Sequence, residues 1–319
     1  MKAAVLHELG RTPRCEEFAE PTAGKDEAVV RVRAASLKAI DRQLASGSHY
    51  ASPRELPVVC GTDGVGELED GTRVFFGGPR RPYGAMAECT VAPRAFCFAV
   101  PADIDDDTAA ALPNPGVSAW LSLTHRARLA AGETVLILGA TGVTGQLAVQ
   151  IAKLLGAKRV IGAGRNERVL GRLRELGADA TIQLEQPEGS LKDAFAREGG
   201  DAGFDVIIDY VWGRPTETLL AAITKSEFAK VTKETRLVQV GESAGATIAL
   251  AAAVLRSTAL TILGTAGIPS REVLADAMQH VMTRAARGEL RIETERVALA
   301  DIESVWQRPE SGRRVVVIP

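Results

Sequence analysis

The sequence predicts an α/β protein in which a doubly wound parallel sheet is joined to a second, mostly β domain. Three observations support this class. Residues 134–162 read as a strand, a glycine turn, a helix and a second strand; strands and helices alternate from there to residue 263; and residues 1–113 read as short strands between Gly and Pro turns. At 319 residues the chain exceeds the usual size of one domain, so two domains are expected.

The central feature is the unit that begins at residue 134. Residues 134–138 form a continuous apolar run rich in β-branched side chains, which suits a strand buried on both faces. Glycines follow at 139, 142 and 145, then apolar residues recur with helical spacing until Gly156, and residues 160–162 suggest the next strand. This order is typical of the βαβ unit that binds a dinucleotide diphosphate, although a tight turn in another α/β domain would have a similar pattern.

The glycine turn has a mechanical role in such a site. The first glycine permits a sharp turn, the second lets backbone N–H groups approach the phosphates, and the third lets the helix pack close to the strand. The helix N-terminus then presents unpaired donors and the positive end of its dipole to the anion. We therefore expect Thr141, Gly142, Val143 and Thr144 to contact the cofactor.

The end of the second strand indicates which nicotinamide cofactor binds. A site selective for NAD normally has Asp or Glu there, whereas this chain has Gly164, Arg165 and Asn166. A guanidinium without a nearby carboxylate suits the 2′-phosphate of NADPH, and Arg168 would add a second positive charge. The alternative is that both arginines are simply solvated at a strand end.

The bulk composition excludes several classes of partner. Hydrophobic residues make up 46% and charged residues 24% of the chain, and the net charge is −2, so nothing indicates binding to nucleic acid or to an acidic membrane surface. No apolar run is long enough to span a bilayer, and the N-terminus lacks the apolar core of a signal peptide. We expect a cytoplasmic protein with a small-molecule substrate.

The cysteines and histidines give no sign of a metal site. The cysteines, at positions 15, 60, 89 and 97, show no Cys-x-x-Cys spacing, and the histidines, at 7, 49, 125 and 280, are scattered. The thiols are expected to be small packing residues in a reducing compartment.

The remaining elements follow from periodicity and turn residues. In the first domain we expect strands at 28–34, 73–76 and 87–91, then a proline-rich turn over 109–116 and a helix over 117–129. Later helices are expected at 168–176, 191–198, 216–233, 250–255 and 271–287, and later strands at 181–184, 204–210, 236–240, 260–263 and 315–318. The expected domains are residues 115–265 for the nucleotide and residues 1–114 with 266–319 for the other domain.

Several motifs in this order resemble the medium-chain dehydrogenase/reductase superfamily, and within it the zinc-independent quinone oxidoreductase branch. They are Asp41 in Leu-Lys-Ala-Ile-Asp-Arg, residues 56–66 with the form Pro-x-x-x-Gly-x-Asp-x-x-Gly, residues 83–88, residues 109–120, the glycine turn, and Asp-Val-Ile-Ile-Asp before Gly213. The resemblance covers nearly the whole chain. It implies a GroES-like domain, a Rossmann domain, and bound NADPH.

The resemblance also implies positions for the site residues. Asn114, Ser118, Val211, Gly241 and Thr265 are expected to line the nicotinamide half of the site. Zinc members of the superfamily carry a His-Glu pair where this chain has Thr62-Asp63, and their first cysteine ligand falls near Lys38. The resemblance therefore implies hydride transfer without a metal. The branch usually has Asn where Lys38 stands, and the loop between Gly66 and Thr72 is shorter than usual.

Two side chains are candidates for the chemistry. The cofactor supplies the hydride, so the protein has to stabilise the negative charge that develops on the substrate oxygen. Tyr50 matches a position where relatives often place an aromatic residue near the substrate, and it could donate a proton or only cap the pocket. Lys38 is a candidate oxyanion-stabilising cation; alternatively it pairs with a carboxylate or a cofactor phosphate.

The expected function is an NADPH-dependent reductase of quinones or α,β-unsaturated carbonyl compounds. One alternative is an enoyl-thioester reductase of a fatty acid or polyketide pathway, which would need a basic patch that the sequence does not clearly show. Another is a low-turnover NADPH-binding sensor or structural protein. Relatives commonly pair the last strand of the sheet across a two-fold axis, so the resemblance implies a homodimer through residues 260–263.

Overall fold

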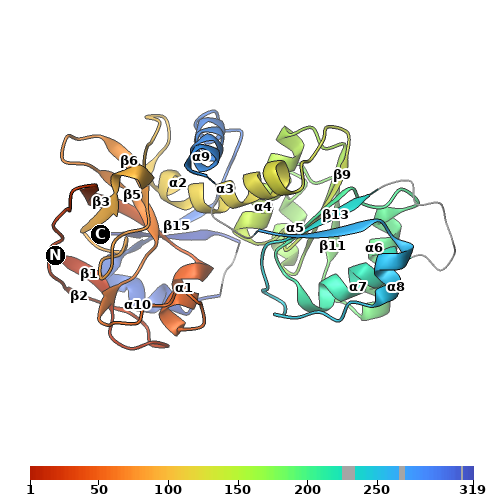
Figure 1. Cartoon of the computed structure of the whole chain (residues 1–319), viewed down its shortest axis with the longest axis horizontal. Helices are drawn as coiled ribbons and strands as arrows, with labels where there is room; N and C mark the ends of the chain where they lie inside the picture. Colours follow the sequence, from red (N-terminus) through yellow and green to blue (C-terminus); the bar gives the residue numbers. More distant parts are fainter. Residues whose placement is uncertain (225–233, 266–269, 310–311) are drawn as a thin grey trace. The chain divides into compact units, whose positions relative to one another are not determined.

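The structure is a computed structural model that describes residues 1–224, 234–265, 270–309 and 312–319, and it separates the chain into two units (Figure 1). Unit 1 contains Met1–Asn114 and Leu274–Pro319, and unit 2 contains Pro115–Val273. The first change of unit falls after residue 114, where the sequence places it. The chain re-enters unit 1 at residue 274, whereas the sequence-based division places the return at 266.

Unit 2 is built on a six-stranded parallel sheet with the order β11-β10-β9-β12-β13-β14. Strands are added outward on both sides of β9, which is the doubly wound order, so the expected fold class is confirmed for this unit. Apolar residues from the strands and the covering helices form its core. The strands are β9 (Thr134–Leu138), β10 (Arg159–Gly164), β11 (Ala180–Gln183), β12 (Val206–Asp209), β13 (Thr235–Gln239) and β14 (Leu260–Gly264).

The helices of unit 2 are shorter than expected at two places. The helix expected at 168–176 ends at Arg172, and turns continue the chain to Gly177. The helix expected at 216–233 ends at Ile223, because Thr224 has extended backbone angles; residues 225–233 lie outside the described residues. The helices are α4 (Val143–Leu154), α5 (Glu167–Arg172), α6 (Glu188–Gly199), α7 (Gly213–Ile223) and α8 (Ala252–Ser257).

The proline-rich turn expected over 109–116 is wrong. The helix α2 (Asp106–Ala111) occupies its first part, and α3 (Pro113–Leu121) begins at the first proline and continues as a π-helix over Ser122–Arg126. Proline lacks an N–H, but the first turn of a helix needs no intrahelical donor, so Pro113 and Pro115 are tolerated there.

Unit 1 is mostly β, as expected. Its larger sheet has the order β15-β16-β3-β5-β6-β8, with β7 paired to β3, and a smaller sheet has the order β2-β1-β4. The strands are β1 (Lys2–Leu6), β2 (Arg14–Glu17), β3 (Glu27–Leu37), β4 (Val58–Val59), β5 (Asp63–Glu67), β6 (Arg73–Gly77), β7 (Cys89–Pro93), β8 (Cys97–Ala99), β15 (Thr294–Ala298) and β16 (Arg314–Ile318). Helices α1 (Ala39–Ser46) and α10 (Ile302–Trp306) belong to this unit, and α9 (Arg271–Ala286) contains the boundary. No helix among the described residues has the length and apolar character needed to cross a bilayer.

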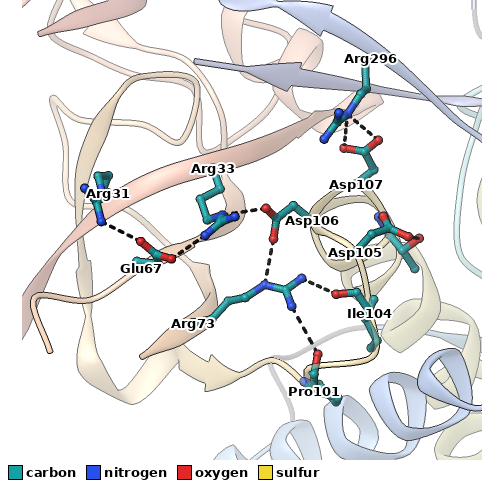
Figure 2. A network of polar contacts seen from close by, with 11 residues as sticks. Arg31, Arg33, Glu67, Arg73, Pro101, Ile104, Asp105, Asp106, Asp107 and Arg296 are labelled. Carbon is teal, nitrogen blue, oxygen red and sulfur yellow. Dashed lines mark hydrogen bonds and ion pairs between the residues drawn. The ribbon is translucent and has the colours of Figure 1, made fainter. Parts of the chain in front are cut away.

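Charged side chains fasten α2 to the large sheet of unit 1 (Figure 2). The Asp106 carboxylate accepts one hydrogen bond from Arg33 of β3 at 2.7 Å and another from Arg73 of β6 at 2.8 Å. The next residue, Asp107, accepts a bond from Arg296 of β15 at 2.8 Å. Carboxylates in the first turn also complement the helix dipole. The network therefore fixes the N-terminal end of α2 against three strands.

Candidate cofactor and substrate sites

The glycine turn of unit 2 places free helix donors at the carboxyl end of β9. Gly139 has a φ of +85°, which turns the chain sharply after the strand, and Gly142 caps α4 without a side-chain hydrogen bond. Val143 and Thr144 occupy the first turn, whose backbone N–H groups have no partner within the helix. A methyl group at Gly145 would lie 2.2 Å from the carbonyl oxygen of Gly139, so only glycine lets the helix approach the turn this closely.

The carboxyl end of β10 lies beside the same turn. A methyl group at Gly164, the last residue of β10, would lie 2.3 Å from the Cγ2 atom of Thr141. Glycine at 164 therefore keeps room for the Thr141 side chain beside the turn. Anions bind well at such a place, because backbone donors and the positive end of the helix dipole converge there. The residues present fit a nucleotide diphosphate.

The residues expected to select NADPH lie directly after β10. Arg165 and Arg168 are exposed, and within the described residues neither guanidinium forms an ion pair. Asn166 has a second task that the sequence analysis did not assign to it: its Oδ1 atom accepts the N–H of Val169 at 3.2 Å and caps α5. Gln183, at the end of β11, donates to the Arg165 carbonyl at 3.0 Å, so two neighbouring strand ends are tied together.

A buried carboxylate organises the turn after β12, and the sequence analysis did not select it as a site residue. Asp209 is fully buried and accepts the N–H groups of Val211 and Trp212 at 2.8 Å and the hydroxyl of Thr216 at 2.5 Å. Burial raises the pKa of the Asp209 carboxyl, and the bond from Thr216 opposes this shift. Trp212 is held at a φ of +55°, a strained value for a residue other than glycine. The available sequence signal was an acid directly after the three apolar residues 206–208.

The other residues expected near the nicotinamide are placed as follows. Val211 is buried beside Gly139, and the N–H of Gly241 donates to the Asp209 carbonyl at 3.1 Å. The structure therefore brings the glycine turn, Val211 and Gly241 together at the carboxyl edge of the sheet. Thr265 is exposed after β14, and Ser118 is half-buried on α3.

Lys38 lies at the centre of a buried polar cluster in unit 1. Its ammonium is 3.0 Å from Asp63 Oδ1 and 3.2 Å from Asp41 Oδ2, and it also donates to the Ser36 carbonyl at 2.9 Å. The side chains of Lys38, Asp41 and Asp63 are each at most 6% exposed. This geometry favours the alternative in which Lys38 pairs with a carboxylate over the alternative of a free oxyanion-stabilising cation.

Neighbouring groups complete this cluster. The Asp41 carboxylate accepts the backbone N–H of Lys38 at 2.8 Å, so it caps α1 from inside the first turn, and it accepts the N–H and hydroxyl of Thr62 at 3.0 Å. Asn114 donates to Asp63 Oδ2 at 3.3 Å. Burial raises the pKa of the Asp63 carboxyl, while the Lys38 ammonium lowers it.

Tyr50 lies in the loop after α1. Its side chain is 97% exposed, and its ring lies 4.1 Å from the ring of His49, measured between centroids. It borders a hollow of about 670 Å³ in unit 1. Within the described residues, no His, Cys, Asp and Glu side chains gather in a group of three or more that could hold a metal ion.

Comparison with known proteins identifies relatives. The sequence pattern of the family described as zinc-binding dehydrogenase matches residues 143–283. The chain is 31% identical over 260 residues to quinone oxidoreductase-like protein 2 of Bos taurus. That alignment covers 78% of this chain and 70% of the Bos taurus protein. It is 31% identical over 223 residues to the quinone oxidoreductase-like protein 2 homolog of Nematostella vectensis, which covers 66% of this chain but only 60% of that protein.

A solved structure extends the likeness to the whole chain. The quinone oxidoreductase of Thermus thermophilus, also solved in complex with NADPH, superposes with a TM-score of 0.80 at 27% identity. That alignment covers 100% of both chains.

Proposed function

The chain belongs to the quinone oxidoreductase branch of the medium-chain dehydrogenase/reductase superfamily, and we propose that it is an NADPH-dependent, zinc-independent reductase. Its proposed reaction is hydride transfer to a quinone or an α,β-unsaturated carbonyl compound. The observation that carries the proposal is the turn over residues 139–145, where close-packed glycines bring α4 against the end of β9 and no side chain caps the first N–H groups of the helix, as in a diphosphate site. The NADPH complex of the Thermus thermophilus relative supports it.

In this proposal the residues of unit 2 bind and orient the cofactor. The N–H groups of Val143 and Thr144 bind the diphosphate, and Arg165 with Arg168 binds the 2′-phosphate of the adenosine ribose. Asp209 fixes the turn that presents Val211 beside Gly139. NADPH, when bound, supplies the hydride, so the protein needs to provide position and electrostatic stabilisation.

The residues of unit 1 support a reaction without zinc. The resemblance places the first zinc ligand of other superfamily members near Lys38, and a protonated lysine has no lone pair to give to a metal. Its ammonium is held by Asp41 and Asp63, which are the nearby carboxylates that a cation would otherwise use. Tyr50 remains the candidate for donating a proton or a hydrogen bond to the substrate oxygen, because its exposed hydroxyl is available.

We also propose that two copies pair through the edge of the six-stranded sheet. Among the strands that the structure describes, β14 pairs with β13 alone, and its residues 260–263 are partly exposed. An edge strand with apolar side chains and unpaired backbone groups suits isologous pairing across a two-fold axis.

The test is a panel of acceptors. NADPH oxidation is measured with 1,4-quinones, alkenals and enoyl thioesters, with and without exhaustive chelation. We expect oxidation with at least one acceptor, a lower KM for NADPH than for NADH, and no effect of chelation. NADPH binding without oxidation of any acceptor would contradict the reductase and favour a sensor or structural role, and a chelator-sensitive rate would contradict the zinc-independent mechanism.

A further inference from the structure

A hollow of about 210 Å³ lies on unit 1 where three chain segments meet. The segments are the turn between β1 and β2, the helix α1 and the C-terminal end of α10. Most side chains around the hollow are polar or cationic, and the lining residues are Gly10, Arg11, Arg42, Gln43, Ser46, Trp306 and Gln307. No Asp or Glu is among the described residues that line it. The hollow therefore carries positive charge, and the proposed function assigns no role to it.

The guanidinium of Arg42 is fixed in orientation and has unused donors. Its Nε atom donates to the Trp306 carbonyl at 2.7 Å, and the side chain is half-buried. Within the described residues Arg42 forms no ion pair, and its two Nη groups meet no acceptor. Arg11 adds a second positive charge. It lies 3.4 Å from Glu8, but their side chains are 74% and 69% exposed, and such a surface pair is easily exchanged for another partner.

The backbone carbonyl groups beside the hollow are already occupied. The helix α1 ends here, and free carbonyl groups at a helix C-terminus would repel an anion. The N–H of Gly10 donates to the Ala45 carbonyl at 2.9 Å, and the Ser46 hydroxyl donates to the Gln43 carbonyl at 3.0 Å. The groups left for a ligand are therefore mainly donors, namely the two guanidinium groups and the exposed side-chain amides of Gln43 and Gln307.

We propose that this hollow binds a phosphate dianion, either inorganic phosphate or the phosphate group of a small monoester. Phosphate oxygens match the planar donors of a guanidinium, and no carboxylate among the described lining residues opposes them. The occupant is small, because cavities for drug-sized ligands begin at about 300 Å³. A bound phosphate would contact α1 and the end of α10 together, and would strengthen the connection that Arg42 makes between them. The site is independent of the proposed reductase activity.

The experiment is calorimetric titration of the full chain with inorganic phosphate and with glycerol 3-phosphate, in a chloride buffer of constant ionic strength. Saturating NADPH is present, so that phosphate does not bind at the glycine turn of unit 2. We expect saturable binding with a Kd below about 1 mM. The variant Q43E places a carboxylate in the hollow at an exposed position of α1, and it should raise the Kd about tenfold or more, because like charges repel. The control R94Q removes an exposed arginine of unit 1 that does not line the hollow, and it should leave the Kd unchanged.

A second variant, R42Q, should also raise the Kd about tenfold or more, because it removes the main guanidinium. It also removes the bond to Trp306, so circular dichroism must show that it is folded; Q43E decides the test if it is not. Phosphate should raise the Tm of the unmodified protein above its value in chloride, and Q43E should lose this increase.

Three results would overturn the inference: no saturable binding below about 10 mM, an unchanged Kd in Q43E, or a Kd for succinate as low as that for phosphate. A lower Kd for glycerol 3-phosphate than for inorganic phosphate would identify a monoester as the occupant, and the reverse order would identify inorganic phosphate. If the chain binds no NADPH, the proposed function fails, and the comparison with Q43E still decides whether the hollow binds phosphate.

Discussion

Replacing Lys38 with methionine should strongly destabilise the protein, because it removes the cation from between two buried carboxylates. The ammonium lies 3.0 Å from Asp63 and 3.2 Å from Asp41. At an effective dielectric constant of about 20, one such contact corresponds to about 5 kcal/mol of Coulomb attraction. The variant also removes the desolvation penalty of the ammonium, so we expect a net loss of about 3 to 5 kcal/mol in the free energy of unfolding at pH 7.

The pH dependence gives this prediction a distinctive sign. Burial already raises the pKa of Asp63 above its ordinary value of 3.8, and the Lys38 ammonium opposes that shift. Without the ammonium the folded-state pKa rises further, so the folded state takes up a proton that the unfolded state does not. At a pH above this raised pKa the buried Asp63 carboxylate destabilises the folded state. The destabilisation decreases as the pH falls through the folded-state pKa toward the pKa that Asp63 has in the unfolded state. The deficit of K38M relative to the unmodified protein should therefore shrink as the pH falls from 7 toward about 4.

Urea unfolding followed by circular dichroism at several pH values measures this deficit. The double variant K38M/D63N, which removes one of the two uncompensated charges, should recover about half of the loss. The control K25M removes an exposed lysine of the same unit and should change the free energy of unfolding by less than about 0.5 kcal/mol. A K38M deficit below about 1 kcal/mol, or one that does not change with pH, would refute the assignment of Lys38 as the counterion of this cluster.

Three further predictions concern the cofactor and the assembly. Arg165→Glu should raise the Kd of NADPH about ten- to a hundredfold and change that of NADH little, as measured by fluorescence titration; equal losses would contradict its contact with the 2′-phosphate. Gly145→Ala should abolish NADPH binding, because its methyl group would lie 2.2 Å from a carbonyl oxygen. The control is Gly171→Ala on α5, where the added methyl group has open space; this variant should bind NADPH normally and stabilise the protein by about 0.5 to 1 kcal/mol. Leu263→Lys on β14 should convert the proposed dimer to a monomer in analytical ultracentrifugation. The control Leu255→Lys, at an exposed position of α8, should leave the dimer intact. An unchanged mass for Leu263→Lys would exclude this edge as the interface.

The sequence predicts an element correctly where the apolar pattern and the flanking turn residues indicate the same bounds. The strand expected at 134–138 has the observed bounds, because an apolar run between two turns can hardly be placed elsewhere. The start of α3 at Pro113 was not predictable, because the sequence alone does not distinguish a proline that ends one helix from a proline that begins another. The helix expected from residue 216 was predicted to be too long. Helical periodicity alone does not show that the helix ends at Ile223.

The site was only partly predictable for a related reason. The glycine turn consists of residues that are close in sequence, so its pattern can be recognised in the chain. The partners of Lys38 could not be recognised in the same way. Asp41 is one helical turn away, but Asp63 reaches the ammonium only because β5 pairs with β3. Arg11 and Arg42 share one hollow only after two separate segments have folded together.

The division of unit 1 into two chain segments has a consequence for folding during synthesis. β16 lies between β15 and β3, with Val315 opposite Leu37, so the seven-stranded sheet needs residues from both ends of the chain. Unit 2 is continuous in sequence and can form its sheet as it leaves the ribosome. The N-terminal strands must wait with an open edge beside β3 until the last strand has been translated. A chaperone that shields such edges would therefore act on the N-terminal strands mainly while the segment that carries β16 has not yet been translated.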